Sequence, residues 1–130
     1  METLDPSLLD RIGGRPRLEL FLKNFYATVR VDPLIGPIFE EMIQDWPAHL
    51  HKIAEFWSLQ MGGPSEYRGG LMARHIPLSL KPGHFDAWLG LWGRSCRAHF
   101  DAPEAGELIQ LAQTFRRRME PVLISRREDG

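Results

Sequence analysis

The chain has 130 residues, of which 43% are hydrophobic and 25% are charged, and its formal net charge is −1. This length is typical of one domain whose core is large enough to enclose a ligand. The balanced charge gives no electrostatic basis for binding nucleic acid or an anionic membrane surface. We therefore expect one globular domain over residues 1–130 that binds neither.

Cysteine usage and the N-terminal residues both bear on the cellular compartment. Cys96 is the only cysteine, so no internal disulfide can form, which fits a reducing environment. The first residues lack the basic and apolar segments of a signal peptide. No apolar run approaches the ~18 residues that span a bilayer. We expect a cytoplasmic protein without a membrane segment.

The spacing of hydrophobic residues predicts helices in the N-terminal half. A short helix over residues 7–12 is expected to end at a pair of glycines. A longer helix over residues 16–31 follows, and one stripe of it is expected to be buried: Leu18, Phe21, Leu22, Phe25, Tyr26 and Val29. The interrupted apolar segment over residues 34–39 should form a short helix or a turn that directs Ile38 and Phe39 inward.

A further helix is expected over residues 45–61, with the aspartate at its start as the N-cap. His49, Ile53 and Trp57 follow one another at intervals of four residues, so they stack on one side of this helix. His51 lies about 200° round the helix from His49 and points largely away. This geometry disfavours a metal site made from the two histidines together.

Two more helices are expected in the C-terminal half, and no segment predicts a strand, so the fold class is all-α. The first begins near residue 82 and has the apolar stripe Phe85, Trp88, Leu89, Trp92 and Cys96. The second begins near residue 102 and has the apolar stripe Leu108, Leu111, Ala112, Phe115, Met119 and Val122.

His75 lies on a short segment between these groups of helices, because Gly69 and Gly70 precede it and Pro77 follows it. A histidine in apolar surroundings is ordinarily a hydrogen-bonded packing residue, but a neutral imidazole is also the commonest metal ligand. The neighbouring helices therefore decide between the two interpretations.

Polar aromatic side chains on three inner helix stripes face this segment: Tyr26, His49 and Trp88. Taken singly, each is an ordinary core residue. Together with one imidazole and an apolar wall they are typical of a haem pocket, in which the groups opposite the iron ligand determine reactivity. The expected wall consists of Phe25, Phe39, Ile53, Trp57, Met72, Ile76 and Phe85. Three basic groups that flank it are candidates for pairing with haem propionates: Arg68, Arg74 and His84.

The chain resembles the truncated haemoglobins, or two-on-two globins, and most of all the third group of that family. Five pieces over residues 20–100 carry the resemblance in the family's order: Phe25-Tyr26-x-x-Val29-x-x-Asp32, Leu34-Ile-Gly-Pro-Ile-Phe39, Trp46-x-x-His49-x-x-x-Ile53-x-x-Phe56-Trp57, Tyr67-x-Gly-x-x-x-x-x-His75 and His84-Phe85-x-x-Trp88-Leu89.

The resemblance implies a globin-like fold, a truncated two-over-two helical sandwich that encloses haem b (iron protoporphyrin IX). It makes His75 the proximal iron ligand. It places Tyr26, His49 and Trp88 on the distal side, with Phe39 against the haem face. The implied function is reversible binding of oxygen and other diatomic ligands, such as carbon monoxide and nitric oxide.

Two alternative functions stay open at this stage. One is a haem enzyme that turns over nitric oxide or peroxide, and it needs an external reductase because the chain has no flavin or nicotinamide fingerprint. The other is a haem-free helical interaction module. Ligation of the iron by His49 in the ligand-free state is a further open alternative.

Overall fold

The computed structural model of the chain describes residues 6–70 and 80–129, with side chains up to residue 122. Its helices are α1 (Leu8–Ile12), α2 (Gly14–Arg30), α3 (Gly36–Met42), α4 (Trp46–Gln60), α6 (Pro82–His99) and α7 (Ala102–Asp129). The described ranges contain no strand. The predicted all-α class is confirmed.

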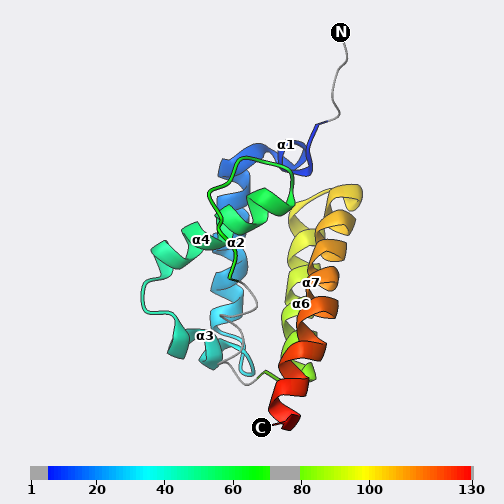
Figure 1. The fold of residues 1–130 in the computed structure, drawn as a ribbon. Coiled ribbons are helices and arrows are strands. Elements are labelled where there is room, and N and C mark those ends of the chain that lie inside the picture. The colour runs from blue at the N-terminus through cyan, green and yellow to red at the C-terminus, as the bar shows by residue number, and fades with distance from the viewer. Residues whose placement is uncertain (1–5, 71–79, 130) are drawn as a thin grey trace.

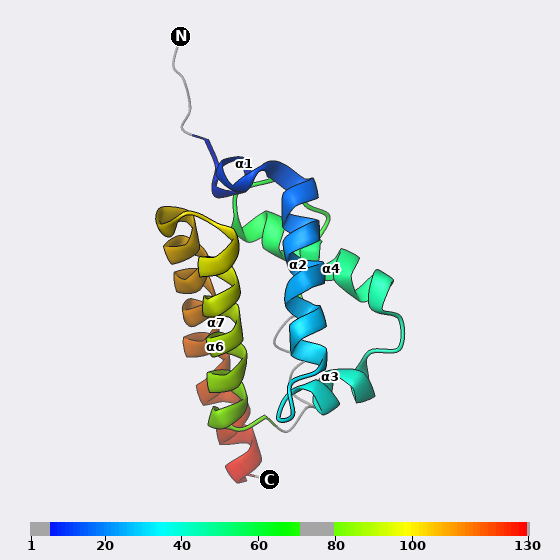
Figure 2. The same ribbon diagram turned by 180° about the vertical axis from the view of Figure 1, so that it is seen from behind.

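The helices form two packed layers (Figures 1 and 2). α6 and α7 lie side by side and antiparallel, while α4 crosses α2 in the other layer. The short helices α1 and α3 extend the two ends of α2. This is the expected two-over-two arrangement. None of the helices within residues 6–70 and 80–129 is long and apolar enough to cross a membrane.

Side-chain caps begin two of the helices, and the one at Asp45 is the predicted N-cap. The hydroxyl of Ser7 accepts a hydrogen bond from the Asp10 amide at 3.1 Å, and the carboxylate of Asp45 accepts one from the Ala48 amide at 3.1 Å. Both contacts satisfy an amide that has no partner within its helix. Gly13 has a φ of 114° and ends α1 in the left-handed conformation that favours glycine.

A tight turn after α2 brings α3 back against the end of α2. One carboxylate oxygen of Asp32 accepts hydrogen bonds from the amides of Leu34 at 2.9 Å and Ile35 at 3.0 Å. A Cβ atom added at Gly36 would lie 2.6 Å from the carbonyl oxygen of Arg30. The close approach of the two helices therefore requires a glycine at this position.

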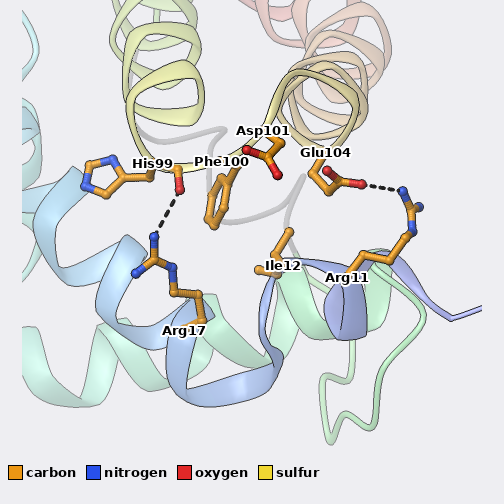
Figure 3. Close-up of a pocket in the computed structure, with 7 residues that line it drawn as sticks. All are labelled: Arg11, Ile12, Arg17, His99, Phe100, Asp101 and Glu104. Atoms are coloured by element: carbon orange, nitrogen blue, oxygen red, sulfur yellow. Dashed lines mark hydrogen bonds and ion pairs between the residues drawn. The ribbon is translucent and has the colours of Figure 1, made fainter.

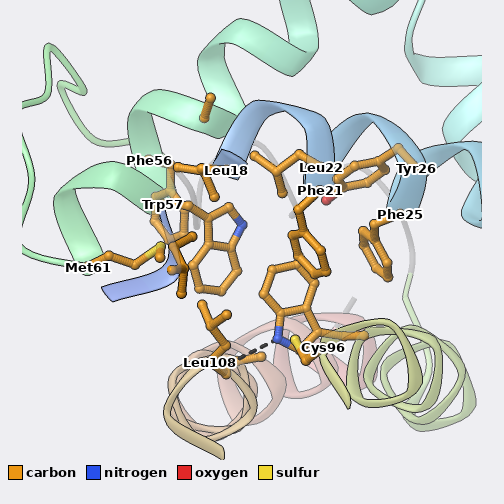
Figure 4. Close-up of a cluster of buried hydrophobic side chains, with 14 of the residues drawn as sticks. Leu18, Phe21, Leu22, Phe25, Tyr26, Phe56, Trp57, Met61, Cys96 and Leu108 are labelled. Carbon is orange, nitrogen blue, oxygen red and sulfur yellow. Dashed lines mark hydrogen bonds between the residues drawn. The ribbon is translucent and has the colours of Figure 1, made fainter. Parts of the chain in front are cut away.

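The core is built around Trp92, which is fully buried. Its indole N–H donates to the carbonyl oxygen of Leu108 at 3.0 Å, which ties α6 to α7. The rings of Trp57 and Trp88 stack on its two sides. The predicted stripe of α2 is buried against this cluster (Figure 4): Leu18, Phe21, Leu22, Phe25, Tyr26 and Val29.

The stripe expected on the last helix is confirmed at Leu108 and Ala112, which are buried, and is wrong at its C-terminal end. Val122 is 41% exposed. The reason is that α7 continues past the beginning of α6 and has no neighbouring helix there (Figure 1).

Two glycine substitutions should have opposite effects on stability. Gly36→Ala places a methyl group against backbone that cannot swing away, so the free energy of unfolding should fall by about 1–3 kcal/mol. Gly106→Ala, in α7, meets no atom within 4 Å and should raise it by about 0.5–1 kcal/mol. Urea denaturation measures both values, and a Gly36→Ala variant as stable as the wild type would contradict the close approach.

Candidate functional site

A pocket of about 790 Å³ opens between the two layers. Its lining comes from α2, α3, α4, α6 and α7 and from the loop that follows α4. Most of the lining side chains are aromatic or aliphatic. The volume lies within the range of about 300–1,000 Å³ that is usual for ligand and cofactor sites.

A second cavity of about 140 Å³ lies between α1, α2 and the turn from α6 to α7 (Figure 3). Three of the charged groups that line it, Arg11, Arg17 and Glu104, already have partners. The guanidinium of Arg11 donates to Glu104 at 3.0 Å and to Glu107 at 2.7 Å, and that of Arg17 donates to the carbonyl oxygen of His99 at 3.0 Å. The larger pocket is therefore the candidate functional site.

The three polar aromatic residues predicted to face one another all line the large pocket. Tyr26 comes from α2, His49 from α4 and Trp88 from α6. Four of the predicted wall residues line it too, namely Phe39, Ile53, Trp57 and Phe85, as do the basic candidates Arg68 and His84. The spacing of His49, Ile53 and Trp57 thus predicted correctly that they share one face of α4. His51, which was expected to point largely away from His49, is 65% exposed but also lines the pocket, so that expectation is wrong in part.

Phe25 differs from the prediction, since it does not line the pocket. Its ring lies behind the pocket wall, edge-on to Tyr26 at 4.9 Å and to Trp88 at 5.3 Å. Phe25 and Tyr26 are adjacent on α2 and therefore point about 100° apart. Only one of them can reach the pocket, and the other supports it from the core.

Four predicted residues lie outside the described part of the chain. They are the proposed iron ligand His75, the wall residues Met72 and Ile76, and the propionate candidate Arg74. Their roles stay predictions.

Several lining residues were not assigned to the pocket from the sequence. Phe115, Arg116 and Met119 come from α7, whose stripe was expected to be buried but not to reach a ligand. Ile38, which was expected to point inward, lines the pocket as well. The remaining lining residues are Ile35, Met42, Ile43, Lys52, Glu55, Phe56, Glu66, Tyr67, Gly69, Leu80, Leu89 and Ala112. Tyr67 and Leu80 lie in segments without helical spacing, so periodicity carries no signal for them.

Tyr26 and Trp88 form the polar centre of the pocket. Tyr26 is only 6% exposed, and burial raises the pKa of its hydroxyl well above the ordinary value because the phenolate would lose its hydration. A hydrogen bond with Trp88 opposes that shift. An indole N–H can only donate. The oxygen of Tyr26 is therefore the acceptor, and its own proton is not used in this bond.

Trp46 packs beside these groups at the start of α4. Its ring lies 6.0 Å from the ring of Tyr26 and 5.7 Å from that of His49, and the guanidinium of Arg30 lies over it at 4.5 Å. Arg30 is also paired with Glu40 of α3. These contacts join the ends of α2, α3 and α4 around one side of the pocket.

The basic groups at the pocket rim differ in how they are engaged. The Nδ1 atom of His84 accepts from the Lys81 amide at 3.0 Å, so His84 caps α6 and retains only Nε2 for another contact. The guanidinium of Arg116 donates to Glu120 at 2.6 Å. Lys52 and Arg68 are exposed, and within the described residues neither forms an ion pair.

A two-layer helical sandwich around an apolar pocket with buried hydrogen-bond donors is the architecture of a small globin. Comparison with known proteins agrees, since the sequence matches the bacterial-like globin family over residues 7–120. The chain belongs to this family.

Two similar proteins are truncated haemoglobins of different groups. The group 3 truncated haemoglobin of Campylobacter jejuni is 31% identical over 97 residues, which cover 71% of this chain and 76% of that protein. The group 1 protein of a Nostoc species is 32% identical over 82 residues, covering 62% and 68%. The crystal structure of the group III protein from Campylobacter jejuni superposes with a TM-score of 0.78 at 26% identity, covering 95% of this chain and 94% of that one.

The chain is thus a truncated globin that is most like the third group, as predicted. Membership of the globin family implies haem binding and the binding of small ligands such as oxygen. The alternative of a haem-free interaction module is not supported. The apolar lining of the pocket and the buried hydroxyl of Tyr26 fit a bound haem group.

The raised pKa of Tyr26 has a measurable consequence at high pH. The Tyr67→Phe variant leaves Tyr26 as the only tyrosine, and its tyrosinate absorbance should not appear near the ordinary pKa of about 10 while the fold persists. Because the unfolded chain releases this proton first, stability should fall as pH rises above about 10. Stability at high pH that is identical in the wild type and in Tyr26→Phe would contradict this expectation.

Proposed function

We propose that the chain is a single truncated globin domain over residues 1–130 that binds haem b in the cytoplasm and reversibly binds oxygen and other diatomic ligands. The observation that supports this most directly is the buried Tyr26 side chain, beside Trp88, in the wall of an apolar pocket. His49 lines the same pocket from a third helix.

In this proposal a haem iron, held by His75 as its proximal ligand, would bind the diatomic molecule. The chain's own contribution is to exclude water and to present donors. The lining aromatic and aliphatic residues keep the pocket dry, so a hydrogen bond inside it is stronger than one in water.

Tyr26 is the main donor in this proposal. The Trp88 indole interacts with it and lowers the pKa of the phenol, against the larger effect of burial. Burial keeps this proton in place at neutral pH. A donor within ~3 Å of a ligand atom with partial negative charge stabilises it by roughly 1.5–3 kcal/mol. His49 donates in only one tautomer and is assigned the weaker role of controlling access.

The propionates of haem would meet the basic rim of the pocket. Arg68 and Arg74 are the candidates with full charge, and Lys52 joins them as a third. His84 is the weakest candidate, because one of its ring nitrogens is engaged in capping α6.

His75→Ala tests the proximal ligand. The variant should purify with little haem, or with haem whose binding external imidazole restores, because the iron loses its proximal ligand. The absorption spectrum of the ferrous protein measures this. His99→Ala is the control, since His99 lines the smaller cavity and not the candidate pocket and should leave haem content unchanged. Full occupancy with an unaltered ferrous spectrum in His75→Ala would refute the assignment.

Substitution of the two donors tests the distal side. Tyr26→Phe and Trp88→Phe should each speed oxygen release by about tenfold, which corresponds to a lost interaction of ~1.4 kcal/mol. His49→Leu should act less. Carbon monoxide carries less charge when bound, so its release should change less. Stopped-flow kinetics measure these rates.

Tyr67→Phe is the matched control for Tyr26→Phe, because Tyr67 lines the same pocket from the loop after α4. It should leave oxygen release unchanged. Equal effects of Tyr26→Phe on both gases, or no effect on oxygen release, would rule out the hydrogen-bonding account.

A further inference from the structure

The loop that follows α4 forms one wall of the large pocket. Glu66, Tyr67 and Arg68 all line it. Residues 64–70 have no helical structure of their own, so their position depends on side-chain and backbone contacts to neighbouring elements. His75, the proposed iron ligand, follows this loop in the sequence.

Neutral hydrogen bonds hold the first part of the loop to α4. The buried hydroxyl of Ser58 donates to the carbonyl oxygen of Pro64 at 2.6 Å, and the amide of Gly63 donates to the carbonyl oxygen of Ser58 at 2.8 Å. The hydroxyl of Ser65 donates to the backbone carbonyl of Glu55 at 2.6 Å. These contacts end just before the residues that line the pocket.

A carboxylate holds the lining part of the loop to the helices, beside the edge-on contact of the Tyr67 ring with Phe56 at 5.1 Å. One oxygen of Glu55 accepts from the Glu66 amide at 2.6 Å, and the other lies 2.9 Å from the guanidinium of Arg15. The side chain of Glu55 is only 14% exposed and also lines the pocket. It therefore joins α2, α4 and the loop. His51, one turn earlier on α4, lies 3.9 Å from the same carboxylate.

The ionised state of Glu55 strengthens both contacts. The Glu66 amide and the Arg15 guanidinium lower the pKa of this carboxyl below its ordinary value. A hydrogen bond to a charged acceptor is shorter and stronger than one between neutral groups. Of the loop's hydrogen bonds to α4 among the described residues, this is the one whose acceptor is charged.

We propose that Glu55 is a positioning residue for the pocket: its carboxylate, held by Arg15, keeps the wall of residues 66–68 in place and so controls how tightly the pocket retains haem. This inference rests on the proposed function.

The chain offers a matched control for this carboxylate. Arg15 pairs with Glu19 as well, through Nε at 2.9 Å, and the side chain of Glu19 is 54% exposed. Glu19→Gln removes one carboxylate partner of Arg15 without touching the loop or the pocket. Glu55→Gln removes the same charge from the pocket wall. A difference in haem loss between the two variants therefore reflects where the charge was removed, because both variants lose one carboxylate.

The test follows haem transfer from the holoprotein to excess apomyoglobin by absorption spectroscopy. Glu55→Gln should lose haem about five- to tenfold faster than the wild type, and Glu19→Gln should lose it at the wild-type rate. Arg15→Gln leaves the Glu66 contact intact and should show an intermediate rate. Amide exchange of Glu66, measured by NMR, should be slow in wild-type holoprotein and fast in Glu55→Gln, while amides of α6 and α7 stay equally protected.

Haem loss at the wild-type rate in Glu55→Gln would overturn the inference, as would equal acceleration in Glu19→Gln. If Glu55→Gln fails to fold, the inference is tested by the rate of haem loss from Arg15→Gln and by the exchange rate of the Glu66 amide in the wild type. An unprotected Glu66 amide, or haem loss from Arg15→Gln at the wild-type rate, overturns the inference. A wild-type chain that takes up no haem overturns the proposed function itself and this inference with it. Uptake by the wild type with equal loss rates in all variants overturns this inference alone.

Discussion

The stack of three indole rings is the packing constraint on which the rest of the structure depends. Trp92 lies between Trp57 and Trp88, with ring centroids 4.5 Å and 5.0 Å away and interplanar angles of 18° and 14°. Its N–H is bonded to α7, so the central ring cannot slide. The outer rings belong to α4 and α6 and also line the pocket. The core packing thus determines the separation of two pocket walls.

The same packing explains how polar groups are tolerated in an apolar wall. A buried hydroxyl costs free energy unless it is hydrogen-bonded, and the Tyr26 hydroxyl interacts with the Trp88 indole. Phe25 lies edge-on to both rings and to Trp92. Aromatic packing from behind therefore supports the positions of both side chains in the pocket wall.

Helical spacing predicted the elements and the shared face of His49, Ile53 and Trp57, because both follow from local geometry. It could not separate Phe25 from Tyr26, since both belong to one buried stripe and only tertiary packing decides which one reaches the pocket. Contacts from Tyr67 and Arg116 join segments far apart in the sequence and leave no periodic pattern. The role of His84 as a helix cap is likewise visible only in its contact with the Lys81 amide.

The distribution of charge around the pocket has a consequence for a bound planar group with two carboxylates. An ionised carboxylate placed among the aromatic walls would lose its hydration without a partner, at a cost that no packing contact offsets. The guanidinium of Arg116 is already paired with Asp86 and Glu120. Lys52 and Arg68 lie exposed at the rim. This distribution of charge supports the proposal that Lys52 and Arg68 would hold the carboxylates of such a group.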